Sequence, residues 1–389
     1  MELTPQDTLR LNVLLANKPQ AVRINENSMT VFGLSASGEA QVKLNPTGRP
    51  DQYLKRVREL LSGHVLGSPG GYPVYLQRWT RMGQMRDDSL EQLLLLGEPE
   101  AVIAAVSAQG LTDELARRAW WAMEDPTNAR HMLRKQAIVE GQMGPLLAAY
   151  LVEHLPFENE PEQQIETVRL VLQPGLLEDE AIEALWRKAQ RKPAYYVGFI
   201  LARPDRLPVE TRAHPLAASD TLTQLARQGN SVARLLQRVC SANGQAFLAT
   251  VVRIFEKPSN QEVVILTLEA IAGYFEEIRP DGRVDMTLDG LDRDAAAWLR
   301  RDADARAVAG IAEVDPLQLI ALRLLSGLSY GVVRPAFGDS TAIGTLMRRK
   351  LQPVLEPLLE ILARLQVEDR PVGGAGPAQG RRSGRRRGR

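Results

Sequence analysis

The chain has 389 residues, of which 44% are hydrophobic, and this length suffices for one large core or two to three smaller ones. Its 48 basic and 47 acidic residues nearly cancel. Six arginines lie in the last ten positions, however, and removing them leaves 42 basic against 47 acidic residues, a balance that argues against nucleic-acid binding by the rest of the chain.

The first 85 residues mix helical and strand-like patterns. An apolar helix is expected near residues 6–17, and the stretches AVRIN, MTVFGL and AQVKLN then alternate as strands of a three-strand meander. A second helix is expected in DQYLKRVRELL, where Leu54, Val57 and Leu61 share one face. The segment YPVYLQRW reads as a short strand, and its proline suggests an edge strand. Residues 1–85 are therefore predicted to form a small α+β unit.

From residue 86 the hydrophobic period changes from two to 3.6. Helices are expected in SLEQLLLL, EPEAVIAAVSAQ and DELARRAWWAM, and short turns should place consecutive helices antiparallel. We predict a helical, repeat-like region at residues 86–278 and a further helical region at 279–367. Residues 368–389 form a predicted disordered tail rich in Arg and Gly, because they contain almost nothing that could build a core. The fold class is thus predicted to be mainly α.

One pair of segments within the helical region is similar in sequence. GLTDELARRAWW, from Gly110, and GLLEDEAIEALW, from Gly175, match at an offset of 65 residues. The matched packing residues are Ala116, Ala119 and Trp121 in the first segment and Ala181, Ala184 and Trp186 in the second. This match could mark a HEAT-like repeat array, and the alternative is two similar helices in a chain rich in Ala and Leu.

The stretch SGHVLGSPGGYP, from Ser62, is the densest in glycine before the tail. It lacks the Lys-Ser/Thr pair of a phosphate loop, it contains no G-x-G-x-x-G, and a strand is expected where a helix should begin. We interpret it as a structural turn built by Gly63, Gly67, Pro69, Gly70 and Gly71. The alternative is a binding surface, for which the candidates are His64, Ser68, Tyr72, Arg78, Trp79 and Arg81.

Other candidate chemistry is sparse. Ser329 lies in GLSYG, a hydrolase-like pattern, but a helix is expected before it and no histidine follows it. No cofactor fingerprint is present. The histidines are isolated in the sequence, so no metal site is predicted and structural or surface roles are expected; they are His64, His131, His154 and His214.

The only cysteine, Cys240, excludes an internal disulfide and favours a reducing compartment. It lies on the apolar face of a predicted helix, where a cysteine behaves as a small hydrophobe. The alternative is a reactive thiolate whose pKa is lowered by Arg234 or Arg238. The N-terminus does not resemble a signal peptide, and the longest apolar run is interrupted by Arg323, so a cytoplasmic protein without a membrane span is expected.

The tail arginines form either a solubilising tail or a contact with nucleic acid or an acidic surface. They are Arg381, Arg382, Arg385, Arg386, Arg387 and Arg389.

Three stretches together resemble the DsrS family, accessory proteins encoded with the reverse-running dissimilatory sulfite reductase system of sulfur-oxidising bacteria. They are LRLNVLLANK, RVRELLSGHVLGSPGGYPVYLQRWTRMGQMRDDSLEQLLLLGEPEAVIAAV and ARRAWWAMEDPTNAR. The similarity covers roughly residues 1–200 and extends to about residue 360. It implies a cytoplasmic protein that serves the oxidation of stored sulfur, with no established catalytic residue or cofactor.

Three functions follow as hypotheses. The first is a non-enzymatic accessory or scaffold protein that contacts protein partners of the sulfur-oxidation machinery. The second is a persulfide carrier or enzyme that uses Cys240. The third is a regulator that binds nucleic acid through the tail.

Overall fold

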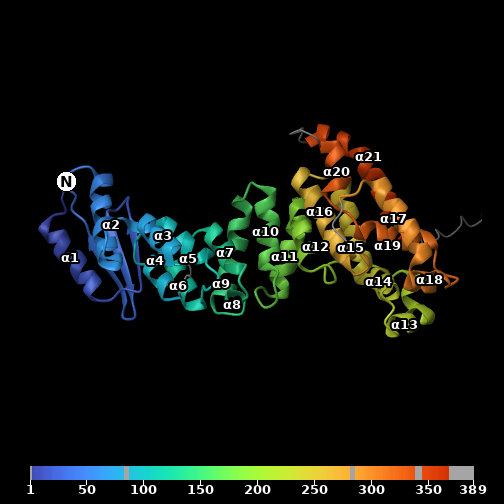
Figure 1. Ribbon diagram of the computed structural model, residues 1–389, viewed down its shortest axis with the longest axis horizontal. Helices are drawn as coiled ribbons and strands as arrows, with labels where there is room; N and C mark the ends of the chain where they lie inside the picture. The colour runs from blue at the N-terminus through green and yellow to red at the C-terminus, as the bar shows by residue number, and fades with distance from the viewer. Residues whose placement is uncertain (1, 83–86, 281–284, 338–343, 368–389) are drawn as a thin grey trace, which may run out of the picture. The chain divides into compact units, whose positions relative to one another are not determined.

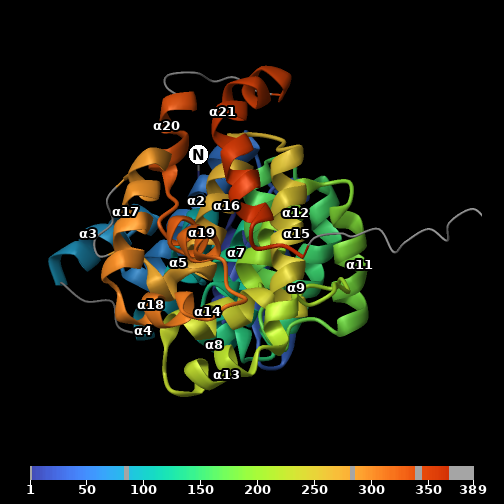
Figure 2. The same ribbon diagram turned by 90° about the vertical axis from the view of Figure 1, so that its right-hand side faces the viewer.

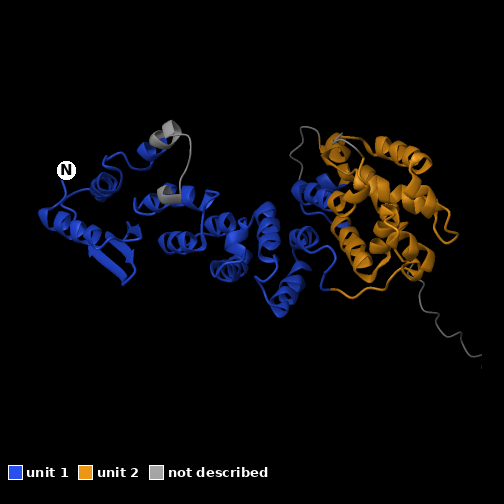
Figure 3. Cartoon of the chain, turned by 60° about the horizontal axis from the view of Figure 1, so that its bottom comes forward, with its two compact units in different colours: residues 1–208, 256–270, 341–348 blue, residues 209–255, 271–340, 349–389 orange. Residues whose placement is uncertain are grey.

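The computed structural model describes residues 2–82, 87–280, 285–337 and 344–367, with the side chains of residues 77–89 left out. It is mainly α-helical, with a small antiparallel sheet near the N-terminus followed by a helical array, as predicted (Figure 1). The chain forms two compact units (Figure 3). Unit 1 comprises Met1–Pro208, Glu256–Ala270 and Thr341–Arg348, and unit 2 comprises Val209–Phe255, Ile271–Ser340 and Arg349–Arg389.

Unit 1 contains the sheet and the first twelve helices. The strands are β1 (Ala21–Asn25), β2 (Thr30–Ser35) and β3 (Gly38–Lys43). The helices are α1 (Pro5–Ala16), α2 (Pro50–Leu66), α3 (Gly71–Met82), α4 (Asp87–Leu93), α5 (Pro99–Ser107), α6 (Asp113–Ala122), α7 (Pro126–Leu133), α8 (Gln136–Val139), α9 (Met143–His154), the 3₁₀ turn η1 (Leu155–Phe157), α10 (Pro161–Val171), α11 (Asp179–Ala189) and α12 (Pro193–Ala202).

Prolines mark the start of many of these helices. Pro5, Pro50, Pro99, Pro126, Pro161 and Pro193 each open a helix. This position suits proline because its ring presets φ for the helix and the missing N–H would have no partner there.

The sheet is the predicted meander. The strand order is β1-β2-β3, both pairs are antiparallel, and Val31 of β2 lies opposite Ile24 of β1 and Val42 of β3. These side chains join Leu11 and Leu14 of α1 and the apolar face of α2 in one core. The inward-facing side chains of the strands and the apolar faces of α1 and α2 therefore form one hydrophobic core.

The segment predicted as an edge strand is instead α3, so that prediction was wrong. Tyr72, Tyr75 and Leu76 have helical spacing, and Tyr75 is buried. Pro73 lies in the first turn of α3. A helix tolerates proline there because a backbone N–H in the first turn has no hydrogen-bond partner within the helix. The proline is thus a helix-start signal here and not an edge-strand signal.

From α4 to α12, helices pack mainly on helices that are close in the chain. α5 contacts α6 and α7, α7 contacts α9, α9 contacts α10, and α10 contacts α12 (Figure 1). Local pairing of this kind is typical of stacked helical arrays. Every described secondary-structure element after residue 85 is a helix.

The sheet and the array share unit 1, and direct contacts connect them. The Val22 N–H donates to the Leu94 carbonyl at 2.8 Å. The Arg23 guanidinium lies 4.6 Å from the Trp121 ring, and the Trp121 indole donates to Glu39 at 2.8 Å. These contacts explain why the division into units does not fall at the predicted boundary near residue 85.

Unit 2 is built from helices only, among the residues described. They are the 3₁₀ turns η2 (Pro215–Ala218) and η3 (Glu276–Ile278), and α13 (Asp220–Arg227), α14 (Ser231–Cys240), α15 (Ala242–Glu256), α16 (Gln261–Tyr274), α17 (Leu288–Arg301), α18 (Ala303–Ala309), α19 (Pro316–Ser326), α20 (Tyr330–Phe337) and α21 (Gly344–Ala363). Glu256 of α15 and parts of α16 and α21 belong to unit 1.

Helix α19 is central to unit 2. It contacts α14, α17, α18 and η3, and Figure 2 shows it next to α17. Within the described ranges, no single helix combines the length and apolarity needed to cross a membrane, although α19 and α20, which meet at 74°, do so as a bent pair.

Candidate functional site

The glycine-rich stretch folds back onto the end of α2. Gly67 caps α2 with a φ of 65°. The Ser62 hydroxyl donates to the Ser68 carbonyl at 2.5 Å and accepts the Gly71 N–H at 2.7 Å. Ser62 is fully buried, so it closes the turn from inside. This residue was missed in the sequence because a serine at a helix end has no distinctive spacing.

A carboxylate of the protein caps the helix that follows the glycines. Glu98 accepts the Tyr72 N–H at 3.0 Å. Gly71 has a φ of 62°, and a Cβ added there would lie 2.2 Å from Glu98 Oε1. A free helix N-terminus can attract an anionic ligand, but here Glu98 already supplies the negative charge. Residues 67–70 form the turn between α2 and α3, but Gly63, which was predicted to belong to this turn, lies within α2. The argument against a phosphate loop rests on Glu98, since a helix does begin at Gly71.

The candidate binding residues around this turn are only partly described. His64 is exposed on α2, and the Tyr72 ring is half-buried with its centroid 6.4 Å from that of Tyr75. Arg78, Trp79 and Arg81 lie on α3, but their side chains are outside the described residues. A binding surface here stays a prediction.

Two glycines of this stretch should respond oppositely to alanine. Gly63 lies within α2 and an added Cβ would meet nothing within 4 Å, so Gly63→Ala should raise the free energy of unfolding by up to about 1 kcal/mol. Gly71→Ala should lower it by about 1–2 kcal/mol, because its φ is left-handed and Glu98 must move.

Urea denaturation followed by tryptophan fluorescence measures both changes. Four of the five tryptophans lie in unit 1, and only Trp298 lies outside it. The fluorescence signal therefore reports mainly on the unfolding of unit 1. Equal effects of the two substitutions would contradict the assignment of Gly71 as the constrained position.

The residues matched between the two similar segments have different surroundings. Ala116 and Ala119 are fully buried, whereas Ala181 and Ala184 are half-buried. Trp121 contacts the sheet, while Trp186 packs against Tyr196 and Phe199 of α12 at centroid distances of 4.8 and 4.9 Å. The matched helices therefore do not occupy equivalent positions, and a true repeat stays a prediction.

The histidines make local contacts. His131 Nδ1 lies 3.3 Å from an Arg134 guanidinium nitrogen, the His154 ring stacks on Tyr150, and His214 Nδ1 accepts the Leu216 N–H at 3.2 Å. Burial lowers the pKa of both His131 and His214. Among the described residues, no group of three or more His, Cys, Asp or Glu side chains is placed to hold a metal ion.

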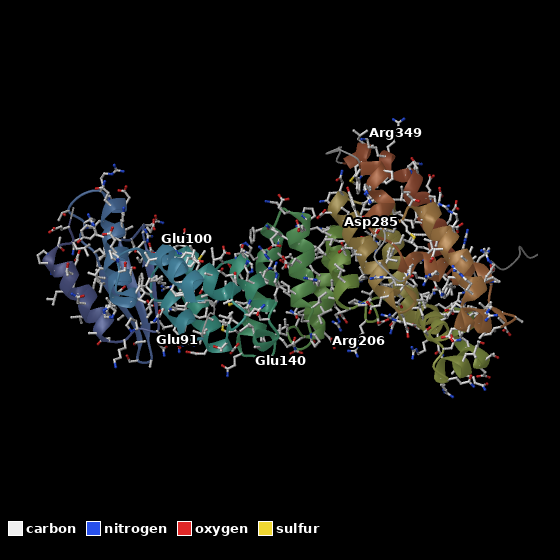
Figure 4. All side chains as sticks on the ribbon, viewed as in Figure 1. Glu91, Glu100, Glu140, Arg206, Asp285 and Arg349 are labelled. Atoms are coloured by element: carbon white, nitrogen blue, oxygen red, sulfur yellow. The ribbon has the colours of Figure 1, made fainter. Side chains whose placement is uncertain are left out.

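Ser329 is not positioned as a hydrolase nucleophile. It follows α19, a helix, where a nucleophile elbow requires a strand. Its hydroxyl donates to Asp285 Oδ1 at 3.1 Å, and Asp285, labelled in Figure 4, also pairs with Arg334. The same hydroxyl also accepts the Gly331 N–H at the start of α20, so it has a structural role.

Cys240 is the last residue of α14, and its side chain is buried in unit 2 with 1% of its surface exposed. Burial raises the pKa of its thiol to about 12. The two arginines that could have lowered this pKa are engaged elsewhere: Arg234 pairs with Glu277, and Arg238 lies 3.9 Å from the Tyr274 ring. A persulfide carrier needs a thiol that is accessible and readily ionised. The burial of Cys240 and its raised pKa both argue against that role.

The Cys240 thiol should accordingly resist modification in the folded protein. We expect no measurable reaction with a dithiobisnitrobenzoate reagent over minutes at pH 8, and stoichiometric reaction in 8 M urea, because only unfolding exposes the thiol and restores an ordinary pKa. Absorbance at the thionitrobenzoate band and intact mass measure this. Rapid labelling of the folded chain would contradict the buried position.

The arginines of the tail lie outside the described residues. Nucleic-acid binding by the tail stays a prediction.

One exposed feature was missed in the sequence. Four aromatic rings from α6, α9 and η1 follow one another: Trp120 meets Tyr150 edge-on at 4.7 Å, Tyr150 stacks on His154 at 5.7 Å, and His154 contacts Phe157 at 5.8 Å. Leu146 lies one turn before Tyr150 on α9. We call Leu146, Trp120, Tyr150, His154 and Phe157 the aromatic stripe.

The aromatic stripe ends in side chains that unit 1 leaves uncovered. Phe157 is 74% exposed and Leu146 is 48% exposed. The adjacent face of α9, with Leu147 and Leu151, is fully buried. The apolar surface of α9 is therefore wider than the face that the rest of unit 1 covers. This excess was the signal that could have revealed the stripe.

Acidic side chains flank the aromatic stripe. Glu124 and Asp125 precede α7 next to Tyr150, whose pKa is raised by burial and then by the charges of these two residues. Glu153 follows Tyr150 by one turn on α9. Glu124 and Glu153 are exposed and form no ion pair with a described residue. The surface is thus apolar in its centre and negative at its edge.

No family model, curated protein or solved structure matches this chain.

Proposed function

We propose that this protein is a non-enzymatic accessory protein that binds a protein partner through the aromatic stripe. The observation that carries the proposal is the exposure of Phe157 and Leu146 beside a series of aromatic rings in contact, of which Tyr150 and His154 are stacked. Aromatic anchors of this kind dominate the energetics of protein–protein interfaces, and surfaces with a polar rim around an apolar centre are typical of them.

The acidic edge indicates the chemistry of the partner. Glu124, Asp125 and Glu153 would meet basic side chains, while Phe157 and Leu146 would contact apolar ones. We therefore propose a partner segment with an apolar face and flanking Lys or Arg. The resemblance to the DsrS family supports a partner from the sulfur-oxidation machinery, with dissimilatory sulfite reductase as the first candidate, and a cytoplasmic location.

Biolayer interferometry between the full chain and purified dissimilatory sulfite reductase tests the proposal. We expect saturable binding that Phe157→Ala weakens at least tenfold, because loss of a central aromatic anchor typically costs about 2 kcal/mol or more. Leu317→Ala is the matched control, since Leu317 is an exposed apolar residue of unit 2 and should leave the affinity unchanged.

The possible failures are distinguishable. Binding that Phe157→Ala leaves unchanged would contradict the role of the stripe but not the partner. Absence of binding to the reductase, with recovery of a different partner that depends on Phe157, would contradict the assignment to sulfur oxidation but not the stripe.

A further inference from the structure

A cavity of about 620 Å³ opens in unit 2, and none of its lining residues belongs to the aromatic stripe. Its volume falls within the range of small-molecule binding sites. It is formed by the segment before η2, the start of α19 and the segment that follows α21. Its polar lining comprises Arg212, His214, Asp315, Gln318, Arg364 and Gln366.

Buried amides fix the walls of this cavity. Gln245 of α15 donates to the Leu365 carbonyl at 2.9 Å and accepts the Val367 N–H at 2.8 Å. Gln318 of α19 donates to the Arg364 carbonyl at 3.2 Å. Both amides are almost fully buried, so their bonds hold residues 364–367 against α15 and α19. The backbone of the opposite wall is held by the His214 N–H, which donates to the Cys240 carbonyl at 2.8 Å.

The side chains that line the cavity offer mainly hydrogen-bond donors. His214 Nδ1 accepts the Leu216 N–H, so the ring proton of the neutral imidazole is on Nε2, which makes that nitrogen a donor. Neither Arg212 nor Arg364 forms an ion pair with a described residue. Asp315 is the one acidic residue among the described lining, and its Oδ1 already accepts the Leu317 N–H at 2.9 Å.

We propose that this cavity binds a small organic dianion. The guanidiniums of Arg212 and Arg364 and the Nε2–H of His214 bind its oxyanion groups, and paired charge-assisted bonds of this kind suit carboxylate or phosphate oxygens. Pro215, Ala363 and Val367 provide the apolar part of the lining, which fits a carbon skeleton and not a bare inorganic ion. The site is independent of the proposed partner surface.

Isothermal titration calorimetry of the full chain tests this site, with succinate and glycerol 3-phosphate as probes that separate carboxylate from phosphate recognition. We expect 1:1 saturable binding of at least one probe. Arg212→Gln and Arg364→Gln should each weaken it about tenfold or more, because each removes charge-assisted bonds. His214→Asn keeps an acceptor for the Leu216 N–H but removes the Nε2–H, and it should weaken binding about threefold to tenfold.

Arg227→Gln is the matched control, because Arg227 is an exposed arginine of unit 2 outside the cavity lining, and it should leave affinity unchanged. All variants retain the tail arginines, so equal binding by the Arg212→Gln/Arg364→Gln double variant would assign the signal to the tail and overturn the proposal. Absence of saturable binding by both probes would also overturn it. So would tighter binding of inorganic phosphate or of a glutamate-rich peptide.

If a Gln variant does not fold, Arg364→Lys or Arg212→Lys provides a second test. Each keeps the charge but not the bidentate geometry, so each should still weaken binding, and unchanged affinity would overturn the proposal.

Discussion

Replacing Arg130 with methionine should lower the free energy of unfolding of unit 1 by about 3–5 kcal/mol, because it leaves a buried carboxylate without its partner. Arg130 of α7 pairs with Glu158, which follows η1, and their side chains are only 7% and 5% exposed. Thr167 of α10 donates to Glu158 Oε2 at 3.0 Å and completes the cluster. The cluster connects three segments of the array, so its loss affects their packing as well as the charge balance.

A nearby ion pair provides the control for this prediction. Arg134 lies one turn further along and pairs with Glu166, but its side chain is 47% exposed. Arg134→Met should therefore cost less than about 1 kcal/mol. Urea denaturation followed by tryptophan fluorescence compares the two variants. The Arg130→Met/Glu158→Leu double variant should recover much of the loss, since no unpaired charge remains. Similar costs for Arg130→Met and Arg134→Met would contradict the argument from burial.

Gly198→Ala should separate α10 from α12 and lower the free energy of unfolding by about 1–3 kcal/mol. A Cβ at this position would lie 2.6 Å from Val168 Cβ and 2.9 Å from the Ile165 carbonyl oxygen. The Ile165 carbonyl oxygen is part of the backbone of α10 and cannot move by a change of rotamer, so α10 and α12 must shift relative to each other.

Gly63→Ala serves as the comparison, because it introduces the same methyl group into open space. A double-mutant cycle of Gly198→Ala with Val168→Ala adds a second measurement. The cost of Gly198→Ala should be smaller in the Val168→Ala background, since part of the obstruction is gone. Equal cost in both backgrounds, measured by urea denaturation, would contradict a contribution from Val168 Cγ1, the nearby atom that alanine lacks.

Much of the fold follows from local patterns in the sequence. The alternation in AVRIN, MTVFGL and AQVKLN places the three strands, and the 3.6-residue period after residue 86 indicates a helical chain. Cys240 was expected on a buried helix face from its spacing with Leu236, and it is buried. The error at α3 arose because Pro73 is compatible with both an edge strand and the first turn of a helix. At such a position, local preference does not choose between the two.

The candidate sites were less accessible to sequence reasoning. Leu146 and Leu147 are adjacent and chemically identical, yet one is 48% exposed and the other fully buried. Similarly, Arg212 and Arg364 are 152 positions apart, and nothing in either neighbourhood marks them as lining one cavity. The sequence shows which residues are apolar or charged, but the packing of other elements decides which of their faces is covered.

The sequence by itself determined the helical character of this protein, the N-terminal meander, and the near balance of charge, because these depend on backbone periodicity and on composition. Tertiary structure alone decided that Glu98 caps α3, that Arg130 meets Glu158 in the core of unit 1, and that the aromatic stripe and the unit 2 cavity exist. The physical reason is that secondary structure is set by interactions within a few residues, whereas contacts such as Tyr72–Glu98, Arg130–Glu158 and Trp120–Tyr150 join residues separated by tens of positions. Such contacts form only where the packing of the core places the segments together.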